Sequence, residues 1–229
     1  MSIFASVAEA GVSSAAQTAR GTIERVEPTK AQRAAARRIA ESKATAPHVY
    51  LDVEIGAEEA PPERIVRACA LALREFPRLN GAYRDGAFEI YSRVNVGVAV
   101  AGAEGPVVVT VFDADRKSAA EIGAELDGLT RRAAAGELTS PELAGGTFTI
   151  VRAAVGSVRS VVAVLNQGQA AALGVGATAE RAVVREGRVV PGRALTATLS
   201  CDGRMVDASE GARFLDRVRE LLEAPGGPT

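Results

Sequence analysis

Signals for helices and for strands alternate along nearly the whole chain, and this alternation limits the possible folds more than any other feature. Thr29 and Gln32 have the spacing of a capping box, and they open an Ala- and Arg-rich helix that Pro47 ends. Ser118 and Glu121 repeat this spacing before a later amphipathic stretch. Two further helices are expected near 61–76 and 209–222. Helices therefore interrupt every run of strands.

Short segments with strand patterns fill the intervals. Residues 49–55 alternate apolar and polar, which indicates a half-buried strand. The run 107–112 (VVVTVF) is apolar on both faces, which favours a central strand. Further strands are expected at 87–91, 94–101, 147–151, 161–165, 173–175 and 195–200, with a hairpin through 186–187. The sequence predicts an α/β fold: a two-layer sandwich in which helices cover one face of a mixed β-sheet.

The ends of the chain differ in character from its centre. Residues 1–21 are small, polar and poor in large apolar groups, so we expect a flexible N-terminal arm. Residues 225–229 are similar and are expected to form a disordered tail. The intervening residues 22–224 are predicted to form one core domain.

Charge and hydropathy exclude several classes of partner. The chain has 27 basic and 28 acidic residues in 229, a formal net charge of −1, and no clustered excess of Lys or Arg. Nucleic acids and anionic membranes need such a cluster, so neither is expected as a partner. No apolar run reaches the roughly 18 residues of a membrane span, and no basic region precedes the N-terminal apolar patch. We therefore expect a cytoplasmic protein.

Metal-binding spacing is missing from the sequence. Cys69 and Cys201 lie far apart, and His48 is the single histidine. Zinc sites need closely spaced Cys and His ligands, so no metal is expected.

Two of these residues are also candidates for chemistry. His48 lies in APHVY, where a helix gives way to a strand, and histidine commonly exchanges protons near neutral pH. A base needs an orienting partner and a pocket, neither of which the sequence reveals, so a structural role is favoured. Cys201 ends an alternating strand and would be a nucleophile only if its thiol were activated. A buried, inert cysteine is the favoured reading.

Asp202, Arg204 and Asp207 form a charged cluster between a strand and a helix. Such a cluster either positions a substrate or pins the turn through charge-assisted hydrogen bonds, and spacing alone favours the second role. The glycines at 144–146 and 174–177 lack the spacing of phosphate-binding loops and are interpreted as turns.

The order of longer motifs resembles a known family. The motifs are RAAARRIAESKATAPHVY, EFPRLNGAYRDG, VNVGVAVA, DADRKSAAEIGAEL, GELTSPELAGGTFTI, QAAALGVG and LSCDGRMVDASEGARFL. Over about residues 20–224 they resemble the catalytic domain of dihydrolipoamide acyltransferases, the core of 2-oxo acid dehydrogenase complexes. The resemblance implies a chloramphenicol acetyltransferase-like fold, active sites between the subunits of a trimer, cages of trimers, and a channel for coenzyme A and a lipoyl acceptor.

The chain departs from this family at two catalytic positions. The family's last motif is Asp-His-Arg, two residues, then Asp-Gly, and its histidine is the general base. Here Gly203 stands at the histidine's position, Ala208 replaces the final glycine, and Asp207 matches the orienting residue. The family's serine after Gly-Thr-Phe-Thr-Ile steadies the oxyanion, and here it is Val151.

These replacements predict a severe loss of the family's reaction. A positioned base contributes roughly 10²–10⁴ in rate. One oxyanion donor contributes roughly 10²–10³, and the two effects need not multiply. Only about 20 linker-like residues precede the core, so we also expect no lipoyl group on this chain.

Two hypotheses remain open. The first is a stand-alone acyltransferase that uses acyl-coenzyme A as donor and a small-molecule, non-lipoyl acceptor that brings its own base. Its substrate-binding candidates are Asp202, Arg204, Cys201 and His48. The second is an inactive scaffold, a trimer or cage that lacks catalysis. A homotrimer is expected in both cases, and the otherwise intact core slightly favours the enzyme.

Overall fold

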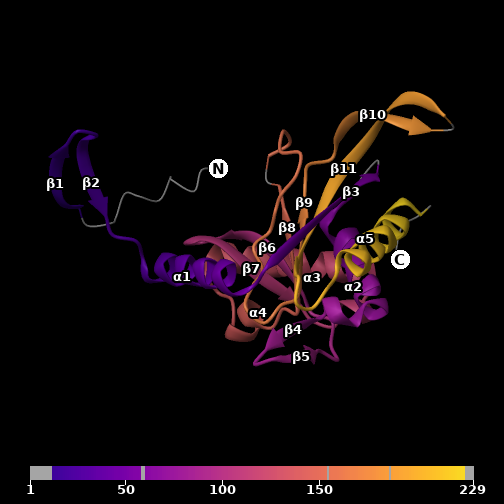
Figure 1. Cartoon of the computed structure of the whole chain (residues 1–229), viewed down its shortest axis with the longest axis horizontal. Helices are drawn as coiled ribbons and strands as arrows, with labels where there is room; N and C mark the ends of the chain where they lie inside the picture. The colour runs from indigo at the N-terminus through magenta and orange to yellow at the C-terminus, as the bar shows by residue number, and fades with distance from the viewer. Residues whose placement is uncertain (1–11, 58–59, 154, 186, 225–229) are drawn as a thin grey trace.

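The computed structural model describes residues 12–57, 60–153, 155–185 and 187–224 (Figure 1). These residues form a seven-stranded mixed sheet in the order β10-β11-β9-β8-β6-β7, with β3 also paired to β11. The strands are β3 (His48–Gly56), β6 (Val96–Gly102), β7 (Gly105–Val111), β8 (Phe148–Arg152), β9 (Ala171–Val175), β10 (Ala179–Arg185) and β11 (Arg188–Asp202). β8 runs parallel to β6 and β9, and the other pairs are antiparallel.

The helices begin where the capping residues predict. α1 (Lys30–Thr45) follows the Thr29–Gln32 capping box, and α3 (Ala119–Ala135) follows the Ser118–Glu121 box. The remaining helices are α2 (Pro62–Glu75), α4 (Ser140–Ala144) and α5 (Ala208–Glu223). Local hydrogen bonds to otherwise unpaired helical N–H groups therefore fix these boundaries.

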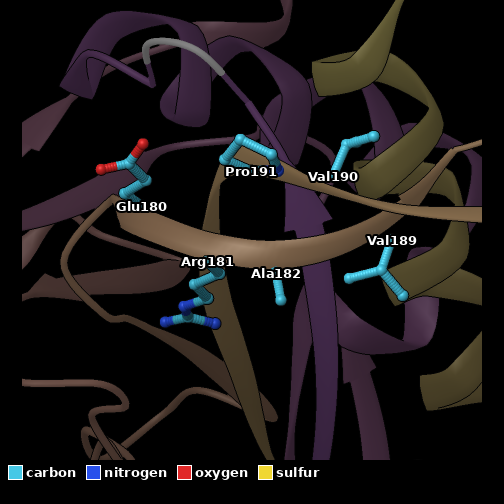
Figure 2. Close-up of a pocket in the computed structure, with 6 residues that line it drawn as sticks. All are labelled: Glu180, Arg181, Ala182, Val189, Val190 and Pro191. Atoms are coloured by element: carbon cyan, nitrogen blue, oxygen red, sulfur yellow. The ribbon is translucent and has the colours of Figure 1, made fainter.

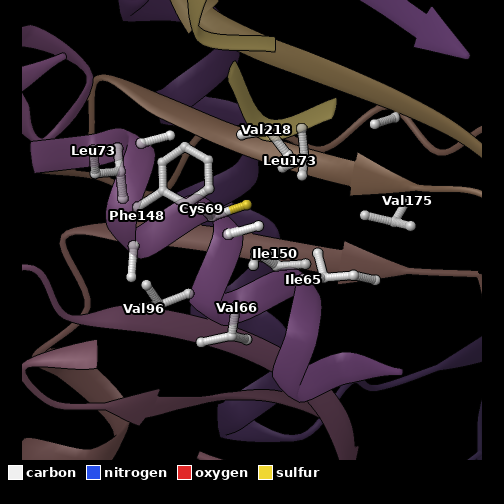
Figure 3. Packing of buried hydrophobic residues seen from close by; sticks show 14 of the residues in the cluster. Ile65, Val66, Cys69, Leu73, Val96, Phe148, Ile150, Leu173, Val175 and Val218 are labelled. Carbon is white, nitrogen blue, oxygen red and sulfur yellow. The ribbon is translucent and has the colours of Figure 1, made fainter. Parts of the chain in front are cut away.

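One face of the sheet, here the first face, carries the main core. α3 packs on β6 and β7, α5 packs on β3 and β11, and α2 lies between the two helices. Figure 3 shows Cys69 and Leu73 of α2 beside Phe148 of β8. The other side of the sheet, the second face, receives the alternate residues of each strand. The two-layer arrangement of helices on a mixed sheet that the sequence predicts is confirmed.

A segment without regular structure crosses the second face, and the predicted strand at 161–165 is wrong for this reason. A Cβ atom added to Gly174 would lie 1.7 Å from the carbonyl oxygen of Val161, and one added to Gly176 would lie 1.9 Å from that of Arg159. Only glycine permits such an approach. Gly174 therefore lies in β9 beneath a crossing segment, and its interpretation as a turn is also wrong.

The run VVVTVF forms β7, but at the edge of the sheet rather than at its centre. Val109 and Val111 are buried beneath α3. The short helix α4 packs beside the same strand. Cover from helices explains an apolar pattern that resembles that of a central strand.

Part of the predicted N-terminal arm has regular structure. β1 (Val12–Thr18) pairs with β2 (Gly21–Val26), and Figure 1 shows this hairpin at the far end of α1, away from the sheet. Residues 1–11 and the predicted tail at 225–229 lie outside the described residues, and the division into arm, core and tail stays a prediction. A small separate sheet joins β4 (Gly81–Arg84) to β5 (Ala87–Ile90). In the described part of the chain, no helix is both long and apolar enough to cross a membrane.

Candidate functional site

Gly203 lies in the turn that follows β11, and its backbone N–H donates to the carbonyl of Pro47 at 2.9 Å. Its φ angle lies outside the left-handed region, so a side chain is compatible with the backbone. An added Cβ would lie 3.1 Å from Cγ2 of Val49 and 3.2 Å from the Pro47 oxygen. A larger residue therefore requires both the Val49 side chain and the Pro47 backbone to shift slightly.

The residues on either side of Gly203 hold the turn. Arg204 Nε and Nη2 donate to the Asp202 carboxylate at 2.9 and 2.6 Å, and the Arg204 backbone N–H donates to the same group at 3.0 Å. Asp202 is only 3% exposed, and these hydrogen bonds raise the pKa of Arg204. The guanidinium also stacks on Tyr83, 4.3 Å from the ring centre. The ion pair with Asp202 and the stacking on Tyr83 together hold the turn, which is the role that the residue spacing favours.

Asp207 caps the last helix. It is the N-cap residue of α5, and its side chain accepts the backbone N–H of Glu210 at 2.8 Å. The residue is exposed and lies four positions after Gly203. Only one of its carboxylate oxygens takes part in this cap.

Cys201 is poorly placed to bind or attack a substrate, which agrees with the favoured interpretation of a buried, inert cysteine. Strand alternation turns its side chain into the core on the first face, where it is fully buried. Burial, and then the charges of Glu210 and Asp202, raise its pKa to about 12. The thiol is therefore protonated at neutral pH and is a poor nucleophile.

His48 connects three parts of the chain. It pairs with Asp202 in the register of β3 and β11. Nδ1 lies 2.8 Å from the Ala46 carbonyl, and the backbone N–H of Leu165 donates to Nε2 at 3.3 Å. These two contacts assign the proton to Nδ1. The imidazole thus fastens the α1–β3 junction to the crossing segment, which agrees with the favoured structural role.

Val151 occupies an apolar seat on the second face of β8. Together with Ala46 it packs against a small cluster of Ala163, Leu165 and Ala172. Strand pairing aligns Val151 with Gly174, and Gly174 with Thr198. The Val151 side chain itself has no hydroxyl to donate.

One protomer keeps the two replaced positions apart. Val151 lies level with Thr198, whereas Gly203 follows Asp202, four residues further along β11. Four residues of a strand span about 13 Å, and the two positions are also two strands apart. A site that contains both positions therefore needs a second copy of the chain.

A cavity that the sequence does not predict lies over the second face near β7, and we call it the α1 cavity. Its volume is about 570 Å³. Arg38 of α1 and Thr110 of β7 line it, with no sequence signal beyond the single polar residue in VVVTVF. The other lining residues are Ala35, Ile39, Pro106, Val107, Val108, Leu143, Ala144, Gly146, Val164, Leu165, Asn166, Gln167 and Gln169.

A second, shallow depression of about 410 Å³ lies on the β10–β11 hairpin. Figure 2 shows its lining, which includes Arg181 and Val189 but none of the candidate site residues. Among the described residues, no group of three or more His, Cys, Asp or Glu side chains is placed to hold a metal ion.

Comparison with known proteins relates this arrangement to one enzyme family. The family described as 2-oxoacid dehydrogenases acyltransferase (catalytic domain) matches residues 61–227. The dihydrolipoyllysine-residue acetyltransferase component of the pyruvate dehydrogenase complex of Rickettsia bellii is 32% identical over 210 residues, which cover 83% of this chain and 50% of the relative. The Bacillus subtilis component is 32% identical over 215 residues, 85% and 49% of the two chains. The chain thus spans about half the length of these relatives.

Solved structures agree with the sequence relatives. A probable dihydrolipoamide acetyltransferase from Listeria monocytogenes has a TM-score of 0.83 at 25% identity, covering 88% of this chain and 94% of the other. The cubic core of a pyruvate dehydrogenase multienzyme complex has a TM-score of 0.81 at 25% identity, covering 89% and 92%. The Azotobacter vinelandii acetyltransferase, studied for a serine, a histidine and an asparagine in its mechanism, gives the same values. The chain therefore belongs to the family of 2-oxoacid dehydrogenase acyltransferase catalytic domains.

Proposed function

We propose that this chain is an acyltransferase that takes an acyl group from coenzyme A and transfers it to a small-molecule acceptor rather than to a lipoyl group. The observation that carries the proposal is the preserved frame around the vacant base position. The Asp202–Arg204 pair still holds the turn, and Asp207 still stands four residues after Gly203. Both features also hold the turn and cap α5, so they keep the place of the base in its folded form.

In the proposed reaction, this chain holds the substrates and the acceptor provides the base. The acceptor's nucleophilic atom forms a bond to the acyl carbon, the C–S bond breaks, and the released proton ends on the coenzyme A sulfur. Gly203 supplies space instead of a base, so the acceptor must carry its own proton-accepting group. Among the described residues near this turn, Cys201 is buried and both His48 ring nitrogens are engaged. Neither one replaces the base.

Assembly belongs to the same proposal. We propose a homotrimer, alone or within a cage of trimers, because one protomer separates Gly203 from Val151. The cubic core of a related complex supports this arrangement. Val184 and Val189, which are 71% and 74% exposed on the β10–β11 hairpin, offer an apolar contact surface. We also propose a cytoplasmic location.

A second candidate function is that of an inactive scaffold with the same assembly. The observation in its favour is the apolar seat of Val151, where Ala163, Leu165 and Ala172 surround the place of the family's oxyanion donor. The aliphatic side chains around Val151 cannot donate a hydrogen bond to an oxyanion.

Titration calorimetry with acetyl-coenzyme A, with native mass spectrometry on the same sample, tests the proposal. We expect multiples of three chains, saturable acetyl-coenzyme A binding, and transfer to free dihydrolipoamide no higher than a low background. A trimer that fails to bind acetyl-coenzyme A would favour the scaffold. A monomer at micromolar concentration would contradict the assembly, and transfer within tenfold of a competent relative would contradict the loss of the base.

A further inference from the structure

We infer that the α1 cavity is a binding site for a small amphipathic carboxylate, a molecule with an apolar body and one anionic end. The inference goes beyond the proposed acyl transfer, because the cavity contains neither Gly203 nor Val151. Its volume, about 570 Å³, lies within the range of roughly 300–1,000 Å³ that is typical of small-molecule sites. Four parts of the chain contribute to the lining: α1, β7, α4 and residues 164–167.

The walls of the cavity are apolar and partly uncovered. Ile39 of α1 is 53% exposed and Leu143 of α4 is 47% exposed, although both are large aliphatic residues that line the same cavity. Val108 of β7 and Leu165 add further apolar lining. An apolar ligand would remove this surface from water, which is a favourable change. The walls therefore fit an aliphatic or aromatic body.

Thr110 places a hydroxyl in the lining of this cavity, and the residue is only 1% exposed. A hydroxyl can both donate and accept a hydrogen bond. A polar atom of a ligand would find a partner here.

Arg38 is the one charged residue in the lining, which contains no acidic side chain. It forms no ion pair with any described residue, whereas Arg33 and Arg37 of the same helix pair with Glu27 and Glu41. An unpaired guanidinium has the geometry to bind a carboxylate with two parallel hydrogen bonds. The cavity thus combines an apolar interior with one free cation.

The neighbouring polar residues are already engaged with one another. Thr149 donates to Gln169 at 2.7 Å, Gln169 donates to the Gly146 carbonyl at 2.7 Å, and Asn166 donates to Thr149 at 2.9 Å. Gln167 donates to Glu41 of α1 at 2.7 Å. This network fixes the shape of the cavity and leaves Arg38 as its charged recognition group, with the Thr110 hydroxyl beside it in the lining.

Isothermal titration of the full chain with octanoate, and with octanamide as its neutral counterpart, tests the inference. We expect saturable octanoate binding that is at least tenfold tighter than octanamide binding. Arg38→Gln should weaken octanoate binding at least tenfold, and Thr110→Val by about threefold, whereas Arg37→Gln, the matched control on the same helix, should leave it unchanged.

Each opposite result would overturn the inference. These results are no octanoate binding by a folded trimer, equal binding of the acid and the amide, or an equal effect of the Arg37 and Arg38 substitutions. Acetyl-coenzyme A binding in the same samples separates this test from that of the proposed function. Octanoate binding without acetyl-coenzyme A binding would count against the acyltransferase alone, and the reverse would count against this site alone.

Discussion

The two positions that have lost the family's catalytic side chains have very different surroundings. At the end of β11, Gly203 lies between a hydrogen-bonded ion pair and a helix-capping carboxylate. In β8, Val151 packs against alanine and leucine side chains. The first position has lost a side chain but kept its polar frame. The second has become part of an apolar cluster.

This contrast separates two ways of losing a catalytic group. Replacement by glycine empties a place without changing what surrounds it, so the missing group can be returned or supplied by a ligand. Replacement of serine by valine adds apolar surface that packs, and a returning hydroxyl must enter an apolar environment. The base position should therefore be easier to restore than the oxyanion position.

The largest expected effect comes from restoring both groups. We predict that Gly203→His with Val151→Ser raises acetyl transfer to dihydrolipoamide about 10²-fold over the parent chain, at the low end of what a positioned base contributes. The φ angle of Gly203 suits a side chain, but Val49 and the Pro47 backbone must move by a few tenths of an ångström, so full restoration is not expected. Steady-state transfer kinetics measure the gain.

Asp207→Ala, added to the double variant, is the control, because it removes the side chain four residues after position 203. Alanine also removes the cap of α5, so circular dichroism of the variant must show that the helix is retained. We expect the gain to disappear. A folded, trimeric double variant that binds coenzyme A yet gains nothing would mean that the frame at β11 no longer fits the reaction.

The next effect concerns the frame itself. We predict that Arg204→Met lowers the free energy of unfolding by about 2–3 kcal/mol, because Asp202 is left nearly buried without its charged partner. The exposed pair Arg217–Glu75 provides the control, and Arg217→Met should cost less than about 1 kcal/mol. Urea unfolding monitored by circular dichroism measures both. Equal costs would mean that the ion pair does not hold the turn.

Local chemistry predicted more of this molecule than long-range packing did. The capping boxes at Thr29 and Ser118, and Gly136 in the left-handed conformation after α3, were predictable because each depends on residues close in sequence. The family resemblance is confirmed, and with it the mixed sheet covered by helices. Motif order is a property of the sequence, so no structure is needed to read it.

The errors arise where distant segments meet. The apolar pattern of β7 does not reveal that helices rather than strands cover it. The close approach of Val161 to Gly174 depends on a crossing that local patterns do not encode. The α1 cavity likewise forms from segments that are distant in sequence, so Arg38 and Thr110 could not be recognised beforehand as neighbours in one lining. The burial of Cys201 could be predicted, because alternation along the strand places its side chain and that of Asp202 on different faces of the sheet.

A smaller effect is expected from single substitutions at the two positions that lack the family's catalytic side chains. We predict that Val151→Ser lowers the free energy of unfolding by about 1–2 kcal/mol, because its hydroxyl enters the apolar cluster. Gly203→Ala should change stability by less than about 1 kcal/mol, since reduced backbone freedom of the unfolded chain offsets the contact with Val49. Chemical denaturation of both variants gives the comparison. A larger cost at Gly203 than at Val151 would reverse the contrast drawn here.

The smallest expected effect is an absence of reaction at Cys201. Its pKa of about 12 in the folded chain, against about 8.5 for a free thiol, means that the folded state holds its proton over the intervening pH range. Burial raises the pKa of Cys69 as well. Because the unfolded state ionises first, stability contributed by these protonated thiols is complete below about pH 8.5 and is lost as pH rises toward 12.

At pH 8, iodoacetamide should label neither cysteine in the native chain and both in urea, as mass spectrometry would record. Rapid native labelling confined to Cys201 would show that the end of β11 opens readily. The turn at Gly203 would then be mobile, and its polar residues would not form a fixed site. The two lost positions would differ mainly in mobility, with a mobile turn at Gly203 and a rigid, packed side chain at Val151.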